Sequence, residues 1–412
     1  MLKNYLKLAW KVLWRRKFFT VISLFGISFT LVGLMVATAL LDHVFAPYPP
    51  EVRQHRTLGI FRAEMTGGRS SWHSNAGYKL LDRYARDLPG VERLAITSTA
   101  EQVYSYQGGT RVKLFIRRSD AEYWRVLDYR FLEGGPFTDQ DVANGSLVAV
   151  INASTRDRFF GGPPALGKTI EADGQHFRVI GVVPDVPILR EVSFAELYVP
   201  VTTAKTDAYR EQLLGGFTGL LLAQSPADFP AIKAEFAARL PQIPLPNPRW
   251  EKLTSRASTK FEYAAEMLAG SDGREANTAL LWAFIAGVML LFALLPTVNL
   301  VNLNMSRIME RASEIGVRKA FGASSRTLVG QFIVENVVLA LIGGVLGFLG
   351  SVLVLEIANR SSLIPYAHFA MNYRIFLYGL GLAVFFGVLS GVYPAWRMSR
   401  LHPVQALKGA SR

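Results

Sequence analysis

Four long runs of apolar residues stand out along the chain. They cover Phe18–Leu41, Ala279–Val301, Asn336–Leu355 and Ile375–Tyr393, and none of them contains a charged residue. Each run is long enough to cross the hydrocarbon core of a bilayer as an α-helix, which takes about 20 apolar residues. A buried helix of a soluble protein would explain any one run, but four of them favour a membrane protein with four transmembrane helices.

The first run also has a feature of a secretory signal, because Ala37-Thr38-Ala39 resembles a cleavage site. Its apolar part exceeds the usual length of a signal core, and the basic residues 1–17 precede it. We therefore expect an uncleaved membrane anchor at this position.

The region between the first two runs mixes strand-like and helix-like patterns, so it predicts an α+β domain. Alternation of apolar and polar residues predicts strands, and a period near 3.6 predicts helices. Strands are expected at Leu58–Glu64, Val91–Ser98, Thr110–Arg117, Leu147–Ile151, Phe177–Val183, Glu196–Val199 and Gly219–Gln224. Helices are expected near Asn75–Leu88, at Asp120–Leu127, after a cap at Ser225 or Asp228, and from about Ser258 as a stalk that runs into the second span.

The formal net charge of +13 is concentrated beside the apolar runs. Residues 1–17, 302–331 and 394–412 carry the whole excess, and the rest of the chain is balanced. Lys and Arg flank transmembrane helices on the cytoplasmic side, so these three segments and both termini are expected in the cytoplasm. A nucleic-acid-binding protein is disfavoured, since it would need a basic patch on a folded domain.

The predicted fold is therefore an α-helical membrane protein with a large mixed α+β extracytoplasmic domain inserted between spans one and two. The chain has no cysteine, so this domain depends on its core rather than on disulfides. The predicted segments are a cytoplasmic amphipathic basic segment 1–17, span one 18–41, the extracytoplasmic domain with its stalk 42–278, span two 279–301, a cytoplasmic region 302–331, span three 332–355, a short extracytoplasmic loop 356–374, span four 375–393 and a cytoplasmic tail 394–412.

The octapeptide Gly162–Thr169, GPPALGKT, matches the phosphate-binding pattern GxxxxGK[ST]. Pro163 and Pro164 have no N–H to offer a phosphate. The following residues alternate around Asp173-Gly174, which predicts a β-hairpin and not the helix that a P-loop requires. We therefore expect no ATPase activity from this chain.

No other catalytic or metal-binding pattern is present in the sequence. The six histidines show no HxxxH or HExxH spacing, no cysteine is available, and no GxSxG occurs. We expect neither a catalytic residue nor a metal ligand in this chain.

The segment 307–323, RIMERASEIGVRKAFGA, follows the second span on the predicted cytoplasmic side. Arg311, Glu314 and Arg318 are spaced so that they can pair along one face of a helix. One interpretation is an amphipathic helix lying on anionic lipid. The other is a docking element for a cytoplasmic protein.

Here the chain resembles a known family. The stretch ERASEIGVRKAFGAS looks like the ERxxEIGxRxAxGA signature of MacB/FtsX-like ABC transporter permeases. The ending GVLSGVYPAWRMSRLHPVQALK is similar to that family's YPAxxASxxxPxxAL tail, with Met398 where a small residue is usual. The stretches YWRVLDYRFLEGGPFTDQD and FFGGPPALGKTIEADGQHFRVIGVV look like its periplasmic core domain, and the N-terminus fits its amphipathic helix and first span.

The resemblance implies a multi-pass permease of the bacterial inner membrane that lacks the fused nucleotide-binding domain of MacB and has its large domain in the periplasm. It implies that ATP and Mg²⁺ are bound by a separate cytoplasmic ABC ATPase, and that a second permease copy or a paralogue completes a dimer in the lipid bilayer, with no nucleic acid involved. The ATPase-coupling residues that it implies are Glu310, Arg311, Glu314, Ile315, Gly316, Arg318, Ala320, Gly322 and Ala323.

Several outputs are compatible with that family. One is export or efflux through a periplasmic adaptor and an outer-membrane channel, and others are release of lipoproteins or activation of a cell-wall hydrolase. In each of them, movement is transmitted across the membrane by the permease. A membrane-anchored sensor with an extracytoplasmic ligand site is the alternative from another class of protein.

Glycine and proline positions within the spans suggest how the helices pack. The pairs Gly343/Gly347 and Gly387/Gly391 have the GxxxG spacing that allows close approach of helices, lipid-facing glycine being the alternative. Pro296 removes a backbone hydrogen bond within span two, so a hinge is expected there.

Overall fold

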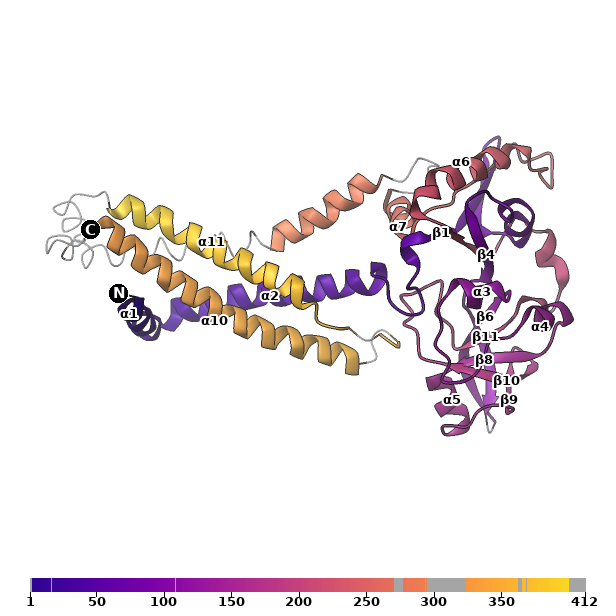
Figure 1. The fold of residues 1–412 in the computed structure, drawn as a ribbon, viewed down its shortest axis with the longest axis horizontal. Helices are drawn as coiled ribbons and strands as arrows, with labels where there is room; N and C mark the ends of the chain where they lie inside the picture. Colours follow the sequence, from indigo (N-terminus) through magenta and orange to yellow (C-terminus); the bar gives the residue numbers. More distant parts are fainter. Residues whose placement is uncertain are drawn as a thin grey trace. The chain divides into compact units, whose positions relative to one another are not determined.

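The computed structural model describes residues 2–15, 17–107, 109–269, 277–292, 294, 317, 324–361, 365–367 and 369–399. The chain divides into two compact units, each of which is described by itself (Figure 1). Unit 1 consists of Met1–Asp42, Trp282–Leu363 and Phe369–Arg412, and unit 2 consists of His43–Leu281 and Ile364–His368.

A 14-stranded sheet organises the described part of unit 2 (Figure 1). Its main path runs β14-β2-β3-β13-β4-β6-β11-β8-β10-β7, and β1, β12, β5 and β9 pair with strands of that path. The pairs β6–β11 and β8–β10 are parallel, and the other described pairs are antiparallel. The strands are β1 Thr57–Ile60, β2 Arg62–Gly67, β3 Ser70–Ala76, β4 Val91–Ser98, β5 Glu101–Gln107, β6 Thr110–Ser119, β7 Glu133–Gly134, β8 Val148–Asn152, β9 Thr169–Ala172, β10 Gln175–Val183, β11 Leu197–Pro200, β12 Leu214–Gly215, β13 Phe217–Ala223 and β14 Lys252–Ser255.

The core of unit 2 lies on both faces of this sheet. The central strand β13 is buried at every position, as expected for a strand that is covered on both sides. Short helices add apolar side chains, among them Tyr123 and Trp124 from α3 and Phe236 from α6. The helices are α3 Glu122–Val126, α4 Asp139–Asn144, α5 Ala153–Phe160, α6 Phe229–Arg239 and α7 Lys260–Ala269.

Most predicted strands occur in unit 2, but one of them is divided and one predicted helix is shorter than expected. The stretch Leu58–Glu64 is two strands, because β1 pairs with β13 whereas β2 pairs with β3. The helix expected near Asn75–Leu88 is present but shorter, because β3 extends to Ala76 and the helical stretch that starts at Tyr78 continues as a π-helix over Leu80–Ala85. The polar, half-exposed residues of β3 form a strand because β2 supplies their backbone partners, from Arg62↔Asn75 to Gly67↔Ser70.

The residues predicted to cap α6 cap the 3₁₀ turn before it, and α6 itself begins without a side-chain cap. The Ser225 hydroxyl accepts a hydrogen bond from the Ala227 N–H, and the Asp228 carboxylate accepts one from the Ser225 N–H. Both residues therefore cap the 3₁₀ turn Pro226–Asp228 that leads into the helix.

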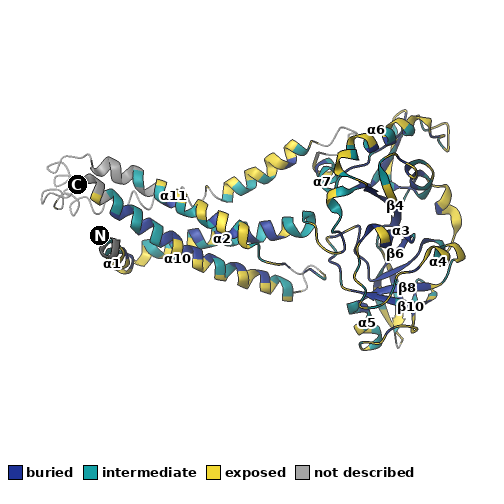
Figure 2. Cartoon of the chain, viewed as in Figure 1, coloured by how far each residue is buried: buried dark blue, intermediate teal, exposed yellow. Residues whose placement is uncertain are grey.

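The described part of unit 1 is helical. Its helices include α1 Leu2–Arg15, α2 Lys17–Phe45, α10 Ser325–Arg360 and α11 Tyr373–Ser399. One stripe of α2 is buried, and it includes Ile27, Leu31 and Met35, whereas the opposite face carries exposed aromatic residues (Figure 2). The buried stripe packs with Leu339 of α10 and Phe376 of α11.

Two of the four expected spans are helices of sufficient length and apolarity in the described residues. They are Lys17–Phe45 and Val329–Arg360. The other two expected spans coincide with the shorter apolar helices Thr278–Phe292 and Tyr373–Leu389. Two of the four expected spans are therefore long enough to cross a membrane within the described residues.

Candidate functional site

The residues expected to couple to an ATPase lie outside the described residues. This applies to Glu310, Arg311, Glu314, Ile315, Gly316, Arg318, Ala320, Gly322 and Ala323, and also to the expected hinge Pro296. On the neighbouring helix α10, the Gln331 amide donates to the Glu335 carboxylate at 2.7 Å, and both side chains are buried.

The expected helix-packing glycines differ in their surroundings. A Cβ atom on Gly343 would lie 2.8 Å from Ile27 Cγ2, and one on Gly347 would lie 2.9 Å from Leu31 Cβ. A Cβ on Gly387 would make an ordinary contact with Ala340, 3.9 Å away. Gly391 lies within α11, but its surroundings are outside the described residues. Any side chain at Gly343 or Gly347 would thus push α2 away from α10.

In the turn that matches the phosphate-binding pattern, the backbone N–H groups of Ala165, Gly167 and Lys168 are bound within the domain. The Ala165 N–H donates to the Glu133 carboxylate at 2.9 Å, and the Gly167 N–H donates to the Val179 carbonyl at 2.8 Å. Thr169 begins β9 and not a helix, as predicted. An anion cradle needs free N–H groups and a helix N-terminus, so this turn does not fit a nucleotide phosphate.

Metal ligands do not cluster in the part of the chain that the structure describes, where no group of three or more His, Cys, Asp or Glu could hold an ion.

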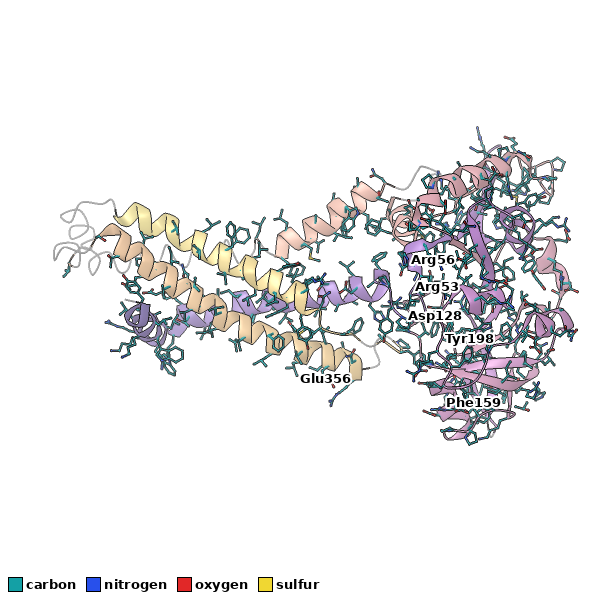
Figure 3. The ribbon with its side chains drawn as sticks, in the orientation of Figure 1. Arg53, Arg56, Asp128, Phe159, Tyr198 and Glu356 are labelled. Atoms are coloured by element: carbon teal, nitrogen blue, oxygen red, sulfur yellow. The ribbon has the colours of Figure 1, made fainter. Side chains whose placement is uncertain are left out.

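The segment that follows α2 is bound tightly to the sheet and its helices (Figure 3). The Pro50 carbonyl accepts from the Asp128 N–H at 2.9 Å. Arg53 Nη1 donates to the Arg125 carbonyl at 2.8 Å, and Arg56 Nη1 donates to the Ala223 carbonyl at 3.2 Å. The chain therefore becomes fixed to unit 2 within a few residues of the end of α2.

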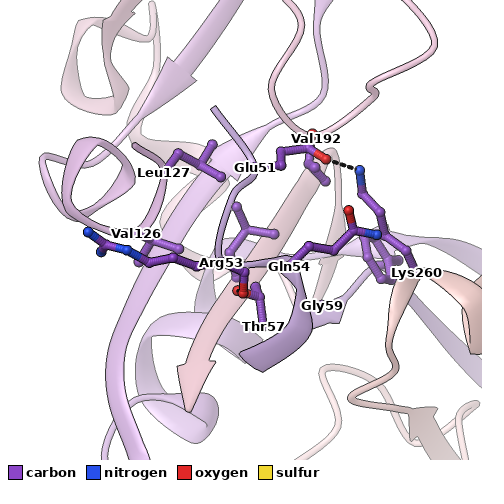
Figure 4. A pocket seen from close by; sticks show the side chains of 11 residues that line it. Glu51, Arg53, Gln54, Thr57, Gly59, Val126, Leu127, Val192 and Lys260 are labelled. Carbon is purple, nitrogen blue, oxygen red and sulfur yellow. Dashed lines mark hydrogen bonds and ion pairs between the residues drawn. The ribbon is translucent and has the colours of Figure 1, made fainter. Parts of the chain in front are cut away.

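A buried group of charges lies at the same place. Glu51 is 3% exposed, and its carboxylate accepts hydrogen bonds from Arg190 Nη1 at 3.2 Å and from the Ser193 hydroxyl. It also accepts one from Lys260 Nζ (Figure 4). We call Glu51, Arg190, Ser193 and Lys260 the entry cluster. It holds two cations against one carboxylate, and such buried charges are costly unless they are paired.

The entry cluster joins the segment after α2 to the start of α7. Glu51 follows α2, whereas Lys260 is the first residue of α7, which precedes the apolar helix Thr278–Phe292. The rings of Phe45 and Phe261 add an edge contact with centroids 5.6 Å apart. The end of α2 and the start of α7 are therefore held together by an ion pair and an aromatic pair.

The loop between β10 and β11 supplies Arg190 and Ser193, and a buried arginine fixes this loop. Arg117 of β6 is 1% exposed, and its guanidinium donates to the carbonyls of Glu191 and Phe194 in the loop and to the Ser98 carbonyl on β4. These bonds hold the loop against the sheet.

Three buried tyrosine hydroxyls support the same loop. Tyr129 and Tyr198 donate to the Ser193 carbonyl at 2.6 and 2.8 Å, and Tyr123 donates to the Val192 carbonyl at 3.2 Å. Burial raises the pKa of Tyr123 to about 12 and holds the pKa of Tyr198 well above its usual range. The hydroxyls therefore stay neutral, and their role is to position the loop.

A cavity of about 30 Å³ adjoins Glu51 and Lys260 (Figure 4). Its apolar walls include Phe61, Leu127 and Leu220. This volume holds about one or two water molecules, whereas pockets for drug-sized ligands occupy about 300–1,000 Å³. We therefore assign no substrate site to it.

The entry cluster could not be found from the sequence. Its three charged members, Glu51, Arg190 and Lys260, are far apart along the chain, and each resembles an ordinary surface charge until the fold brings them together.

Comparison with known proteins gives two matching family models. The MacB-like periplasmic core domain matches residues 20–239, and the FtsX-like permease C-terminal matches residues 286–403. The uncharacterized ABC transporter permease YknZ of Bacillus subtilis (strain 168) is 26% identical over 332 residues, which cover 78% of this chain and 77% of YknZ. The pyoverdine export ATP-binding/permease protein PvdT of Pseudomonas entomophila (strain L48) is 25% identical over 409 residues, which cover 98% of this chain and 59% of PvdT.

Solved structures give weaker likenesses. The periplasmic region of MacB from Actinobacillus actinomycetemcomitans has 17% identity and a TM-score of 0.38, over 51% of this chain and 92% of that one. The extracellular domain of YknZ has 18% identity and a TM-score of 0.37, over 48% of this chain and 98% of that one.

The family models and the relatives define the class of this protein as an ABC transporter permease. The chain belongs to the MacB/FtsX-like family of these permeases, which confirms the resemblance predicted from its motifs at 310–324 and 387–408. Members of this family are associated with the membrane and carry a periplasmic domain, here the α+β sheet domain of unit 2.

Proposed function

We propose that this permease docks a cytoplasmic ATPase and passes ATP-driven movement to its periplasmic domain. The docking element is the segment 302–331, which carries the family signature with Arg311, Glu314 and Arg318. The ATPase binds ATP and Mg²⁺, and the permease binds neither. The permease works as a dimer with four spans per chain in the bacterial inner membrane, with both termini in the cytoplasm.

The observation that carries this proposal is the linkage at the entry cluster. Glu51 and Lys260 connect the segment after α2 to the start of α7, and Arg190 connects both to the sheet at 3.2 Å from Glu51. Because these contacts are buried, a displacement of either helix changes the energy of the whole cluster. Such a linkage suits the transmission of movement between the two segments.

The output that we favour is export. PvdT relatives are named for pyoverdine export, and other relatives are named for macrolide export. An export function would add a periplasmic adaptor and an outer-membrane channel as partners.

Affinity purification of the tagged full-length permease from its own host tests the docking. An ABC ATPase should co-purify with the parent protein, and Glu314→Arg should abolish its recovery, because it places a third positive charge beside Arg311 and Arg318. Membrane insertion of the variant is checked by its recovery in the membrane fraction.

Glu356→Arg is the matched control, since it reverses an exposed carboxylate whose described ion pair is with Arg360 (Figure 3). It should leave ATPase recovery unchanged. Equal recovery with Glu314→Arg would refute the docking role of that residue. Failure to recover any ATPase with the parent protein would favour the sensor.

A further inference from the structure

A short piece of the loop between α10 and α11 belongs to unit 2, although its flanking residues belong to unit 1. The chain leaves unit 1 after Leu363 and returns to it at Phe369. Within the described residues of this piece, the Pro365 carbonyl accepts from the Ile188 N–H at 3.3 Å. The chain also passes between the two units after Asp42 and after Leu281. The piece Ile364–His368 is therefore a third place where unit 2 is linked along the chain to unit 1.

Tyr366 makes the main contact of this piece. Its hydroxyl donates to the Glu196 carboxylate at 2.5 Å, and its ring lies 6.1 Å from that of Phe194, measured between centroids. Phe194 lies on the β10–β11 loop, and Glu196 lies at its end, directly before β11. Arg117 binds the same loop at the Phe194 carbonyl.

The Glu196 carboxylate that accepts this hydrogen bond is buried and is held in place by two other donors. Its side chain is 6% exposed, and it also accepts from Arg158 Nη2 at 3.1 Å and from the Phe115 N–H at 2.9 Å. The carboxylate is thus held in place by donors from β6 and α5, and the tyrosine completes its hydrogen bonds. Burial and the bond to Glu196 raise the pKa of Tyr366 well above its usual range, so the hydroxyl stays a donor.

The backbone of Tyr366 is strained. Its φ of +61° lies in the left-handed region, which residues with large side chains rarely adopt. A conformation of this kind persists when surrounding contacts hold it, and here the contacts are those of the tyrosine side chain.

Asparagines anchor both ends of the loop within unit 1. The Asn359 side chain exchanges two hydrogen bonds with the Phe369 backbone, at 2.7 and 3.1 Å. Asn372 donates to the Asp42 carboxylate at 2.7 Å and accepts from the Ile375 N–H at 3.2 Å.

We propose that Tyr366 is a strained latch, which docks the loop between α10 and α11 onto Glu196 and releases it during the ATP cycle. The release rests on the proposed function, whereas the docking does not. The latch makes the β10–β11 loop the common contact of all three connections, because Arg190 binds Glu51 and Ile188 binds Pro365.

The experiment uses the absence of native cysteine in the full-length chain, purified in detergent with its ATPase. Ala367 is 5% exposed, so a maleimide should react slowly with Ala367→Cys while the latch is closed. Adding Tyr366→Phe removes one hydrogen bond to a charged group and should speed labelling by about tenfold. Tyr106→Phe, which removes an exposed tyrosine hydroxyl in the same domain, should leave the rate unchanged.

ATP with orthovanadate should raise the labelling rate of Ala367→Cys toward that of the Tyr366→Phe variant. Equal rates with and without Tyr366→Phe would overturn the docking, and a rate that ATP leaves unchanged while the ATPase is bound would overturn the release. If no ATPase is recovered, the proposed function and ATP-driven release fall together, but the Tyr366→Phe comparison still decides the docking.

A second pair of variants covers the case in which Ala367→Cys does not fold. Ile188→Cys with Pro365→Cys should form a disulfide under mild oxidation, because their backbones share a hydrogen bond. Locking the latch in this way should block ATP-dependent export until the disulfide is reduced. Failure to form the disulfide would overturn the docking, and unchanged export with the disulfide intact would overturn the release.

Discussion

Glu51→Gln is the substitution whose effect follows most directly from the structure. The carboxylate is 3% exposed and is shared by Arg190, which is 1% exposed, and by Lys260. Glutamine keeps the shape of the side chain but removes the charge that compensates both cations. Removal of one partner from a buried ion pair costs about 3–5 kcal/mol, and the partial exposure of Lys260 places this case near the lower end, about 3 kcal/mol.

Thermal unfolding of the full-length protein in detergent, followed by tryptophan fluorescence, measures the effect. For a domain of about 150–250 residues, each kcal/mol lowers the melting temperature by about 2–4 °C, so Glu51→Gln should lower it by about 6–12 °C. Glu235→Gln is the matched control, because Glu235 forms an exposed ion pair with Arg239, and such a pair is worth about 0–1 kcal/mol.

A double variant tests the charge balance of the entry cluster. With Glu51→Gln alone, two cations remain without their carboxylate, whereas Glu51→Gln with Lys260→Gln leaves only Arg190. The double variant should therefore melt at a higher temperature than Glu51→Gln alone. A double variant that is less stable than Glu51→Gln, or a single variant that matches Glu235→Gln, would refute the electrostatic account of this cluster.

Three further predictions concern packing, pH and topology. Gly347→Leu inserts a side chain between packed helices and should destabilise the protein by about 1–3 kcal/mol, which the melting temperature in detergent measures. Gly381→Leu should leave the melting temperature unchanged, because a Cβ atom at Gly381 meets no described atom within 4 Å. Burial raises the pKa of Asp120 to about 7, so the stability that its protonated form contributes is present below about pH 4 and is lost as the pH rises through 7. Chemical unfolding from pH 4 to 8 should show this loss of stability, and the Asp120→Asn variant should not show it. Ser70→Cys should react with an impermeant maleimide in intact cells or spheroplasts and Ser324→Cys only after lysis, and the reverse pattern would contradict the predicted topology.

The local pattern of the chain predicted much of unit 2 because several strands carry their own evidence. The predicted Val91–Ser98 matches β4, and the hairpin around Asp173-Gly174 matches β9 and β10. These strands have apolar alternation and turn residues that do not depend on distant partners. The rejection of the phosphate-binding pattern also succeeded on local grounds, since a proline cannot donate its N–H.

Strand β3 and the split between β1 and β2 could not be predicted in the same way. The residues of β3 are polar and mostly exposed or half-exposed, and they form a strand because β2 lies beside them. Phe61 separates β1 from β2, so the one predicted strand is two strands, of which β1 pairs with β13 and β2 pairs with β3. Pairing between strands is decided by the tertiary structure, and local propensity is a weak guide to it.

The sequence by itself determined the class of the protein, because apolar runs of membrane-spanning length, flanking basic charge and family motifs are all readable without a fold. Only the tertiary structure decided which charged residues are buried and what they bind. Glu51, Arg190 and Lys260 became one cluster, and Tyr366 met Glu196, because folding brings together segments that lie far apart in the chain. Desolvation then makes those few contacts energetically important, and desolvation is a property of the packed domain.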